Sequence, residues 1–271
     1  MCGLTVFYNI QDLEQKIDIL FRYIENRGPD KNIYKKFDNF HCLFSRLAIQ
    51  DLSSNGDQPI QSQSKRYFML FNGEIYNQKD IKLKIDKIYP SKKWKSTSDT
   101  EILLESFDIF GVDKTLEILR GMFAIFLYDF SNREVLLIND IFGEKPLYYQ
   151  INKNSFLVSS SLDSFKYQKK KLNVDALKEL TTINYIKHPN TAWDKIFKIE
   201  PSAIITFKVG DSISKVSKYK YYNLNKKIPL IKSSMDNLTY NLEDCLFKSV
   251  EQQLISDVPV GSFLSGGTDS T

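Results

Sequence analysis

The chain has 271 residues, 42% of them hydrophobic and 26% charged, with a formal net charge of +4; this composition suits a globular protein of one large or two smaller domains. Its lysines are scattered through polar stretches without an aromatic-plus-basic motif, which argues against nucleic acid as a partner. No run approaches the roughly 18–20 apolar residues of a membrane helix and no secretory signal is present, so we expect a cytoplasmic protein without a membrane partner.

About the first 160 residues alternate between strand-like and helical patterns. Apolar positions in residues 13–24 share one helical face that ends near Gly28, and a shorter helix is predicted over residues 114–119. Ser98 and Glu101 have the spacing of a capping box, which predicts a helix start. The predicted strands are residues 2–9, 41–49, 67–76, 122–129, 134–139, 147–150 and 156–159. Many strands in near succession, with helices grouped between them, favour an α+β fold of stacked sheets covered by helices over a doubly wound βαβ fold.

The sequence loses its regular apolar periodicity at about residue 208. A helix over residues 173–180 and a strand over residues 199–207 precede it, and residues 210–234 are polar, lysine-rich and without periodicity. Apolar residues then recur at three- and four-residue spacing over residues 235–254, which predicts a helix of about five turns. A strand-like run at residues 260–264 follows. We therefore predict a domain of residues 2–207, a linker of residues 208–234 and a further segment of residues 235–271.

Cys2 lies between Met1 and Gly3. Removal of Met1 would leave Cys2 with a free α-amine, whose pKa of about 7.7–8.0 allows it to act as a base for the thiol on the same residue. Taken alone, a chance cysteine near the N-terminus explains this pattern better. Three cysteines in all, without metal-type Cys/His spacing, predict neither a disulfide framework nor a metal site.

Seven further motifs follow Met-Cys-Gly in order, and each alone has little specificity. They are Arg27-Gly28-Pro29-Asp30, Ser45-Arg46-Leu47-Ala48-Ile49, Gly56-Asp57-Gln58-Pro59, Phe71-Asn72-Gly73-Glu74-Ile75-Tyr76-Asn77, Ser98-Asp99-Thr100-Glu101, Arg120-Gly121-Met122-Phe123-Ala124 and Phe142-Gly143-Glu144-Lys145-Pro146-Leu147-Tyr148-Tyr149. In this order they resemble the glutaminase domain of glutamine-hydrolysing asparagine synthetases, a class II glutamine amidotransferase family. The resemblance runs from Cys2 to about residue 207 and resumes at residues 256–270. It implies the four-layer αββα sandwich of N-terminal-nucleophile hydrolases.

Hydrolysis of the glutamine side-chain amide to glutamate and ammonia needs a nucleophile and an oxyanion site. Cys2 supplies the thiolate. Asn72, with its side-chain N–H, and Gly73, with an unobstructed backbone N–H, resemble the oxyanion hole of the family. One such donor is worth on the order of 2.7–4 kcal/mol in the transition state. A surface turn is the alternative explanation for Asn72-Gly73.

The reaction also needs a clamp for the amino-acid head group of the substrate. The resemblance assigns Arg46 to the substrate α-carboxylate, a role that suits a bidentate guanidinium. It assigns Glu74 and Asp99 to the substrate ammonium. The alternatives are a surface salt bridge for Arg46 and a helix cap for Asp99. The glutaminase reaction implies no cofactor.

A glycine-containing motif, Ser265-Gly266-Gly267-Thr268-Asp269-Ser270, stands near the C-terminus. It resembles the pyrophosphate-binding loop of ATP-dependent adenylating enzymes, in which glycines let backbone N–H groups approach phosphate and a following helix adds its dipole. The residues assigned to the nucleotide are Ser265, Gly266, Gly267, Asp269 and Ser270. The resemblance implies that residues 235–271 are the first part of an α/β ATP-pyrophosphatase-type domain, truncated here, and that the full-length family uses ATP and Mg. A plain glycine-rich turn is the alternative.

The chain departs from the family pattern away from the nucleophile. Asn26 and Ser45 stand where the family commonly has histidine, and residues 139–143 lack the arginines of the family segment. These departures affect the expected acceptor more than glutamine hydrolysis. In the full-length family the ammonia amidates aspartate to asparagine; a relative that amidates another carboxylate, such as one on a surface sugar, and an inactive fragment are the alternatives. The oligomeric state stays open, a homodimer included.

Overall fold

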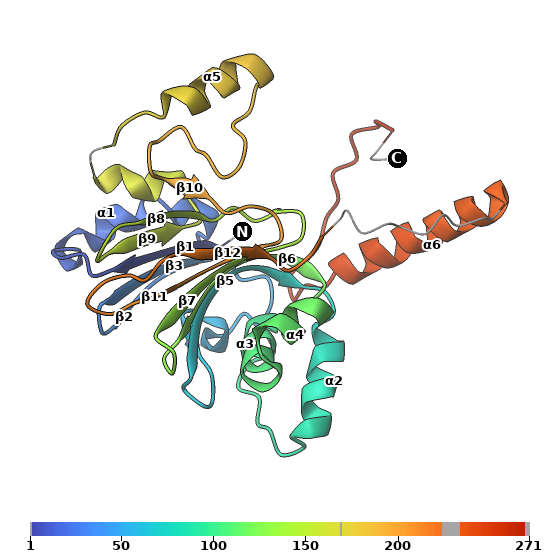
Figure 1. Cartoon of the computed structure of the whole chain (residues 1–271). Helices are drawn as coiled ribbons and strands as arrows, with labels where there is room; N and C mark the ends of the chain where they lie inside the picture. The colour runs from blue at the N-terminus through green and yellow to red at the C-terminus, as the bar shows by residue number, and fades with distance from the viewer. Residues whose placement is uncertain (1, 169, 224–233, 269–271) are drawn as a thin grey trace.

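The computed structural model describes residues 2–168, 170–223 and 234–268. Within these residues two six-stranded antiparallel sheets have the strand orders β10-β8-β9-β1-β3-β2 and β12-β11-β7-β6-β5-β4 (Figure 1). The strands are β1 (Gly3–Tyr8), β2 (Lys31–Phe37), β3 (Phe40–Arg46), β4 (Ile60–Gln61), β5 (Tyr67–Ile75), β6 (Gly121–Asp129), β7 (Glu134–Asn139), β8 (Tyr148–Ile151), β9 (Phe156–Ser159), β10 (Phe197–Lys198), β11 (Ala203–Lys208) and β12 (Ser217–Lys220). The helices are α1 (Ile17–Phe21), α2 (Gln78–Ile88), α3 (Asp99–Phe110), α4 (Val112–Ile118), α5 (Val174–Ile183) and α6 (Met235–Gln253).

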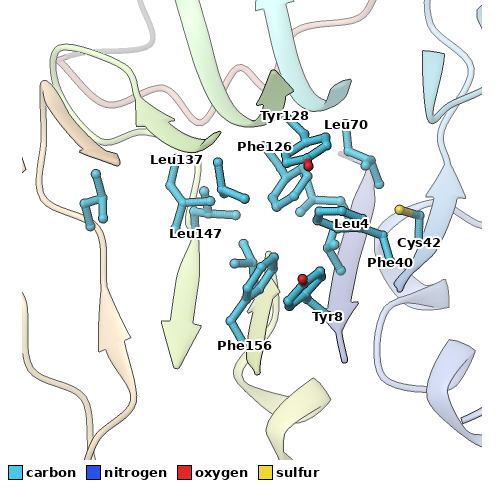
Figure 2. Packing of buried hydrophobic residues seen from close by; sticks show 14 of the residues in the cluster. Leu4, Tyr8, Phe40, Cys42, Leu70, Phe126, Tyr128, Leu137, Leu147 and Phe156 are labelled. Atoms are coloured by element: carbon cyan, nitrogen blue, oxygen red, sulfur yellow. The ribbon is translucent and has the colours of Figure 1, made fainter. Parts of the chain in front are cut away.

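The two sheets face each other across a core rich in aromatic rings. Figure 2 shows Phe40 and Phe156 of the first sheet meeting Phe126 and Tyr128 of the second. The ring centroids of Phe40 and Tyr128 lie 4.6 Å apart. Such rings bury large apolar areas and favour tilted or edge-to-face contacts, so this layer supplies much of the hydrophobic stabilisation.

Helices cover the outer face of each sheet, because alternate strand residues point away from the central core. Met69 of β5 and Ile125 of β6 pack against Ile85 of α2 and Leu103 of α3 on the second sheet. On the first sheet, Phe7, Leu43 and Leu157 pack against the segment that contains α1 and against Phe165. The layers are therefore αββα, as the sequence predicts.

Two helical predictions are wrong in detail. The segment around residues 13–24 is not one helix: α1 is short and lies between 3-10 turns at Glu14–Lys16 and Glu25–Arg27. Helix α3 does begin after Ser98, but no capping-box bond forms. The Glu101 carboxylate instead accepts hydrogen bonds from the backbone N–H groups of Lys95 and Ser96, the second at 2.7 Å.

Other elements differ from the prediction at the edges of the fold. Strand β2 is an edge strand with exposed lysines, which hides its period-two pattern, and α2 is a helix that the sequence patterns do not predict. Strand β12 lies inside the segment predicted as a linker and pairs with β11. The run at residues 260–264 is not a strand, because no described segment pairs with it; Phe263 is fully exposed. Helix α6 projects from the sandwich, and none of its residues is buried (Figure 1).

Candidate active site

One cavity of about 160 Å³ is lined by all six residues that the sequence predicts for glutamine hydrolysis. It lies where the start of β1, the end of β3, the second half of β5 and the start of α3 come together. The predicted residues that line it are Cys2, Arg46, Asn72, Gly73, Glu74 and Asp99. Its size suits a ligand no larger than an amino acid.

Cys2 is half-buried at the start of β1. Its Sγ accepts a hydrogen bond from the backbone N–H of Leu47 at 3.5 Å, and its backbone carbonyl accepts one from Arg27 Nε at 3.3 Å. Burial raises the pKa of the Cys2 thiol, while the Leu47 bond and the charge of Arg46 act in the opposite direction. The thiol is therefore protonated near neutral pH and needs a base to become a nucleophile.

Asn72 lies in the middle of β5 and not in a surface turn. Its side chain is 1% exposed, and its Nδ2 has no hydrogen-bond partner among the described residues. Buried amide groups are nearly always paired, because an unpaired donor costs about 1–3 kcal/mol. An unpaired donor in a cavity beside a thiol is the arrangement expected of a group that binds an oxygen of a ligand.

Gly73 is required by the packing of the sheet. A Cβ at this position would lie 2.1 Å from the carbonyl oxygen of Met122 on β6. Its N–H direction follows from its neighbours: Phe71 N–H donates to Gln58 Oε1 at 2.6 Å and Ile75 N–H to Asp99 Oδ2 at 2.8 Å, both away from β6. Because N–H directions alternate along a strand, the Gly73 N–H points the same way, toward the side on which Gln58 and Asp99 line the cavity.

Arg46 is buried and ion-paired with Asp57 at 2.9 Å, so its salt bridge is an internal one. Its Nη1 also donates to the Ser53 carbonyl at 2.6 Å, and its Nη2 donates to the carbonyls of Gln50 and Asp51. Both terminal nitrogens thus hold residues 49–57, which we call the rim loop. The predicted bidentate contact to a substrate carboxylate remains a prediction, and it requires some of these bonds to be released.

Asp99 and Glu74 are two carboxylates that line the same cavity. Burial raises the pKa of Asp99 to about 7, against the hydrogen bond from Ile75 N–H; the charge of Glu74 raises it further. Burial also raises the pKa of Glu74, and the charge of Lys145 opposes this rise. Asp99 starts α3, but its carboxylate bonds to the end of β5.

Lys145 is a cavity residue outside the set that the sequence motifs assign to the substrate. It is 6% exposed, and its ammonium makes no hydrogen bond or ion pair with any described residue. Burial lowers its pKa, while the charges of Glu74 and Glu144 raise it. Lys145 belongs to the seventh motif, residues 142–149, so its place in that motif is the sequence signal that could have identified it. Asp57 and Gln58, which brace Arg46 and Phe71, likewise belong to the third motif.

The predicted phosphate loop is described only as far as Thr268, so Asp269 and Ser270 lie outside the described residues. Gly266 adopts a positive φ of 75° in an exposed turn, and nothing lies within 4 Å of a Cβ placed on it. The described part of this loop, including Ser265 and Gly267, is irregular and exposed and contains no helix start. Among the described residues, no cluster of His, Cys, Asp and Glu could hold a metal ion, and no helix is long and apolar enough to cross a membrane.

Residues 1–222 match the family model described as a glutamine amidotransferase domain. The chain belongs to this family. Residues 241–271 match a second model, described as asparagine synthase. Over its full length the chain is 30% identical to asparagine synthetase (glutamine-hydrolyzing) 1 of Bacillus subtilis (strain 168), covering 43% of that protein, and 28% identical to asparagine synthetase (glutamine-hydrolyzing) of Homo sapiens, covering 47%. The chain thus spans about half the length of the curated relatives it matches.

Two solved structures share the fold. The glutamine phosphoribosylpyrophosphate amidotransferase from B. subtilis, complexed with ADP and GMP, aligns with a TM-score of 0.51 at 14% identity over 83% of this chain and 50% of that one. The allosteric regulatory enzyme of purine biosynthesis aligns with a TM-score of 0.55 at 14% identity, with the same coverage of both chains. At this identity the likeness shows the fold alone, and that fold agrees with the predicted αββα sandwich.

Proposed function

We propose that the cavity at Cys2 hydrolyses the side-chain amide of glutamine to glutamate and ammonia. The Cys2 thiolate attacks the amide carbon, and the negative charge on the carbonyl oxygen is stabilised by Asn72 Nδ2 and the Gly73 N–H. The C–N bond then breaks and ammonia leaves with a proton, which leaves a γ-glutamyl thioester on Cys2. Water hydrolyses the thioester, releases glutamate and restores the thiol.

The unpaired Nδ2 of Asn72 carries this proposal. It is a buried donor without a partner among the described residues, and it lines the cavity that contains the Cys2 thiol; Gly73, whose N–H faces away from β6, lines the same cavity. Two donors beside one nucleophile are what a tetrahedral intermediate of acyl transfer needs. Neither a structural cysteine nor a packing asparagine needs this arrangement.

A base for the thiol is also required, because burial raises the Cys2 pKa. After removal of Met1 the α-amine of Cys2 serves as this base, directly or through a water molecule. The mature protein then starts at Cys2.

Glu74 and Asp99 bind the substrate ammonium, since both carboxylates line the cavity. A bound ammonium also favours the ionised form of Asp99, whose pKa burial raises to about 7. Arg46 either binds and orients the substrate carboxylate directly or, through its bonds to the rim loop, positions the cavity wall that faces this carboxylate.

The ammonia is used, in this proposal, for ATP-dependent amidation of aspartate. The support is the name of the matched relatives, asparagine synthetase, and the match of residues 241–271 to the asparagine synthase family. Amidation of another carboxylate is the alternative. The described part of the phosphate loop forms no cradle for a nucleotide, so the support for this second reaction comes from the relatives and not from the geometry of the loop.

Ammonia release from glutamine by the purified chain tests the proposal, with Cys2→Ala as the inactive variant. Cys245 is exposed and lies on α6, so Cys245→Ala is the matched control and should keep full activity. A mass spectrum should show the active protein without Met1 and should trap the thioester after rapid acid quench. Wild-type turnover by Cys2→Ala, or Met1 on the active protein, would refute the assignment.

A further inference from the structure

The segment after α6 is bonded to the rim loop by two hydrogen bonds. The backbone N–H of Asp257 donates to the Ile49 carbonyl at 2.9 Å, and the Asp257 Oδ2 accepts from the backbone N–H of Asp51 at 2.7 Å. The two segments are 206 residues apart in sequence. We call this pair of bonds the Asp257 clasp.

A local turn presents Asp257 for these bonds. Ser256 Oγ accepts from the backbone N–H of Val258 at 3.1 Å and lies 2.9 Å from the Val258 carbonyl, to which it donates. This Ser256–Val258 turn leaves both the N–H and the carboxylate of Asp257 free to face the rim loop. An ordered turn therefore makes the contact, although the Asp257 side chain lies at the surface.

The other side of the clasp is part of the cavity. Ile49 and Gln50 line it, and Gln50 Oε1 accepts from Gln78 Nε2 at 2.6 Å. Asp51 is 7% exposed, and its carboxylate accepts from Thr97 N–H at 2.9 Å, two residues before Asp99. The peptide groups held by the clasp are thus continuous with the cavity wall and adjoin the residues that start α3.

We propose that Asp257 is a positioning residue for glutamine: the clasp holds the rim loop in the conformation that binds the substrate. The inference rests on the proposed glutaminase function. Arg46 holds the same loop from the inside through the Gln50 and Asp51 carbonyls, and Asp257 holds it from the outside through the Asp51 N–H and the Ile49 carbonyl. The substrate head group would meet a wall fixed on both sides.

The clasp also links the cavity to the segment that matches asparagine synthase, because Asp257 lies in that segment. Binding linkage is reciprocal: if the clasp increases the affinity for glutamine, bound glutamine stabilises the clasp by the same free energy. Bound glutamine therefore slows hydrogen exchange in residues 255–268. This readout does not depend on turnover.

The test compares Asp257→Ala, Asp257→Asn and Glu243→Ala in the full chain. Asparagine keeps an oxygen that accepts from Asp51 N–H, whereas alanine does not. Glu243 is an exposed acidic residue on α6, so its removal changes charge in the same segment without touching the rim loop. We expect Asp257→Ala to raise the KM for glutamine about three- to tenfold with kcat nearly unchanged, the usual worth of one hydrogen bond. Asp257→Asn and Glu243→Ala should keep the wild-type KM.

The exchange experiment uses the Cys2→Ala background, in which glutamine binds without turnover. Glutamine should slow exchange in residues 255–268 there, and the addition of Asp257→Ala should abolish this effect. An unchanged KM in Asp257→Ala, in a chain that still releases ammonia, would overturn the positioning role alone. Failure of the wild-type chain to bind glutamine or release ammonia would overturn the proposed function, and this inference with it.

Discussion

Arg46 and Asp57 form a buried ion pair, with Nη1 of the arginine 2.9 Å from Oδ1 of the aspartate. The pair joins the end of β3 to the rim loop, and Lys31 bonds the other oxygen of Asp57 from the surface. An isolated buried charge is costly, so each member of the pair fixes the other. The cavity wall therefore depends on a residue that the family resemblance assigns to the substrate.

We predict that Arg46→Lys affects both stability and glutamine binding. One ammonium cannot replace two terminal nitrogens that reach four acceptors. The KM for glutamine should rise at least about tenfold and the free energy of unfolding should fall by about 1–3 kcal/mol, measured by kinetics and by urea titration. Lys31→Met is the control, because half of the Lys31 side chain is exposed and its loss should change neither quantity much. Unchanged stability and KM in Arg46→Lys would contradict the bracing role.

Asn72→Ala should lower kcat by about 10²–10³ and leave the KM for glutamine nearly unchanged, because its N–H acts on charge that develops in the transition state. Asn139→Ala is a matched control. The pairing of β5, β6 and β7 places Asn72, Ala124 and Asn139 in one row, and Asn139 Nδ2 is also unpaired among the described residues, but Asn139 does not line the cavity. Equal losses of kcat in the two variants would point to packing instead of an oxyanion site.

The pH dependence of the free energy of unfolding should reflect the protonation of Asp99. Burial raises its pKa from 3.8 to about 7, so between about pH 4 and pH 7 the folded state holds a proton that the unfolded state has lost. The contribution of Asp99 to stability therefore falls as pH rises through this window and stays low above it. Asp99→Asn should remove this decline and stabilise the protein at pH 8, by up to about 4 kcal/mol.

Glutamine binding should show the opposite trend, because the substrate ammonium requires the Asp99 carboxylate. Calorimetry on Cys2→Ala should find affinity rising between about pH 6 and pH 8. The double variant with Asp99→Asn should bind more weakly, with a smaller dependence on pH. If the two proteins gave the same affinity at pH 8, Asp99 would not be part of the clamp.

Lys145→Met should stabilise the fold and weaken glutamine binding. Lys145 is largely buried and its ammonium has no ion pair among the described residues, so a methionine of similar length relieves the cost that burial imposes on the charged form. The same change removes the positive charge that favours ionised Glu74, so the KM should rise. Thermal unfolding and steady-state kinetics separate the two effects. A fall in stability with an unchanged KM would mark Lys145 as structural.

Local patterns in the sequence determined the central strands and the order of the site motifs. Strands β1, β5, β6 and β7 are buried over most of their length, and such strands carry a strong apolar signal. Strand β2 carries lysines on an exposed edge of the sheet, so its sequence lacks the clear apolar alternation that predicts a strand. The ordered motifs resemble a known glutaminase domain, and that resemblance predicts that Cys2, Asn72 and Asp99 belong to one site; the structure places all three along the same cavity.

Only the tertiary structure decided how these residues are used. The direction of the Arg46 guanidinium, the burial of Lys145 and the bonds between Asp257 and the rim loop each depend on partners from elements distant in sequence. Periodicity and motif spacing describe which residue types stand near one another along the chain. They contain no information on which acceptor satisfies a buried donor, because that choice is made when the sheets, helices and loops pack together and exclude water.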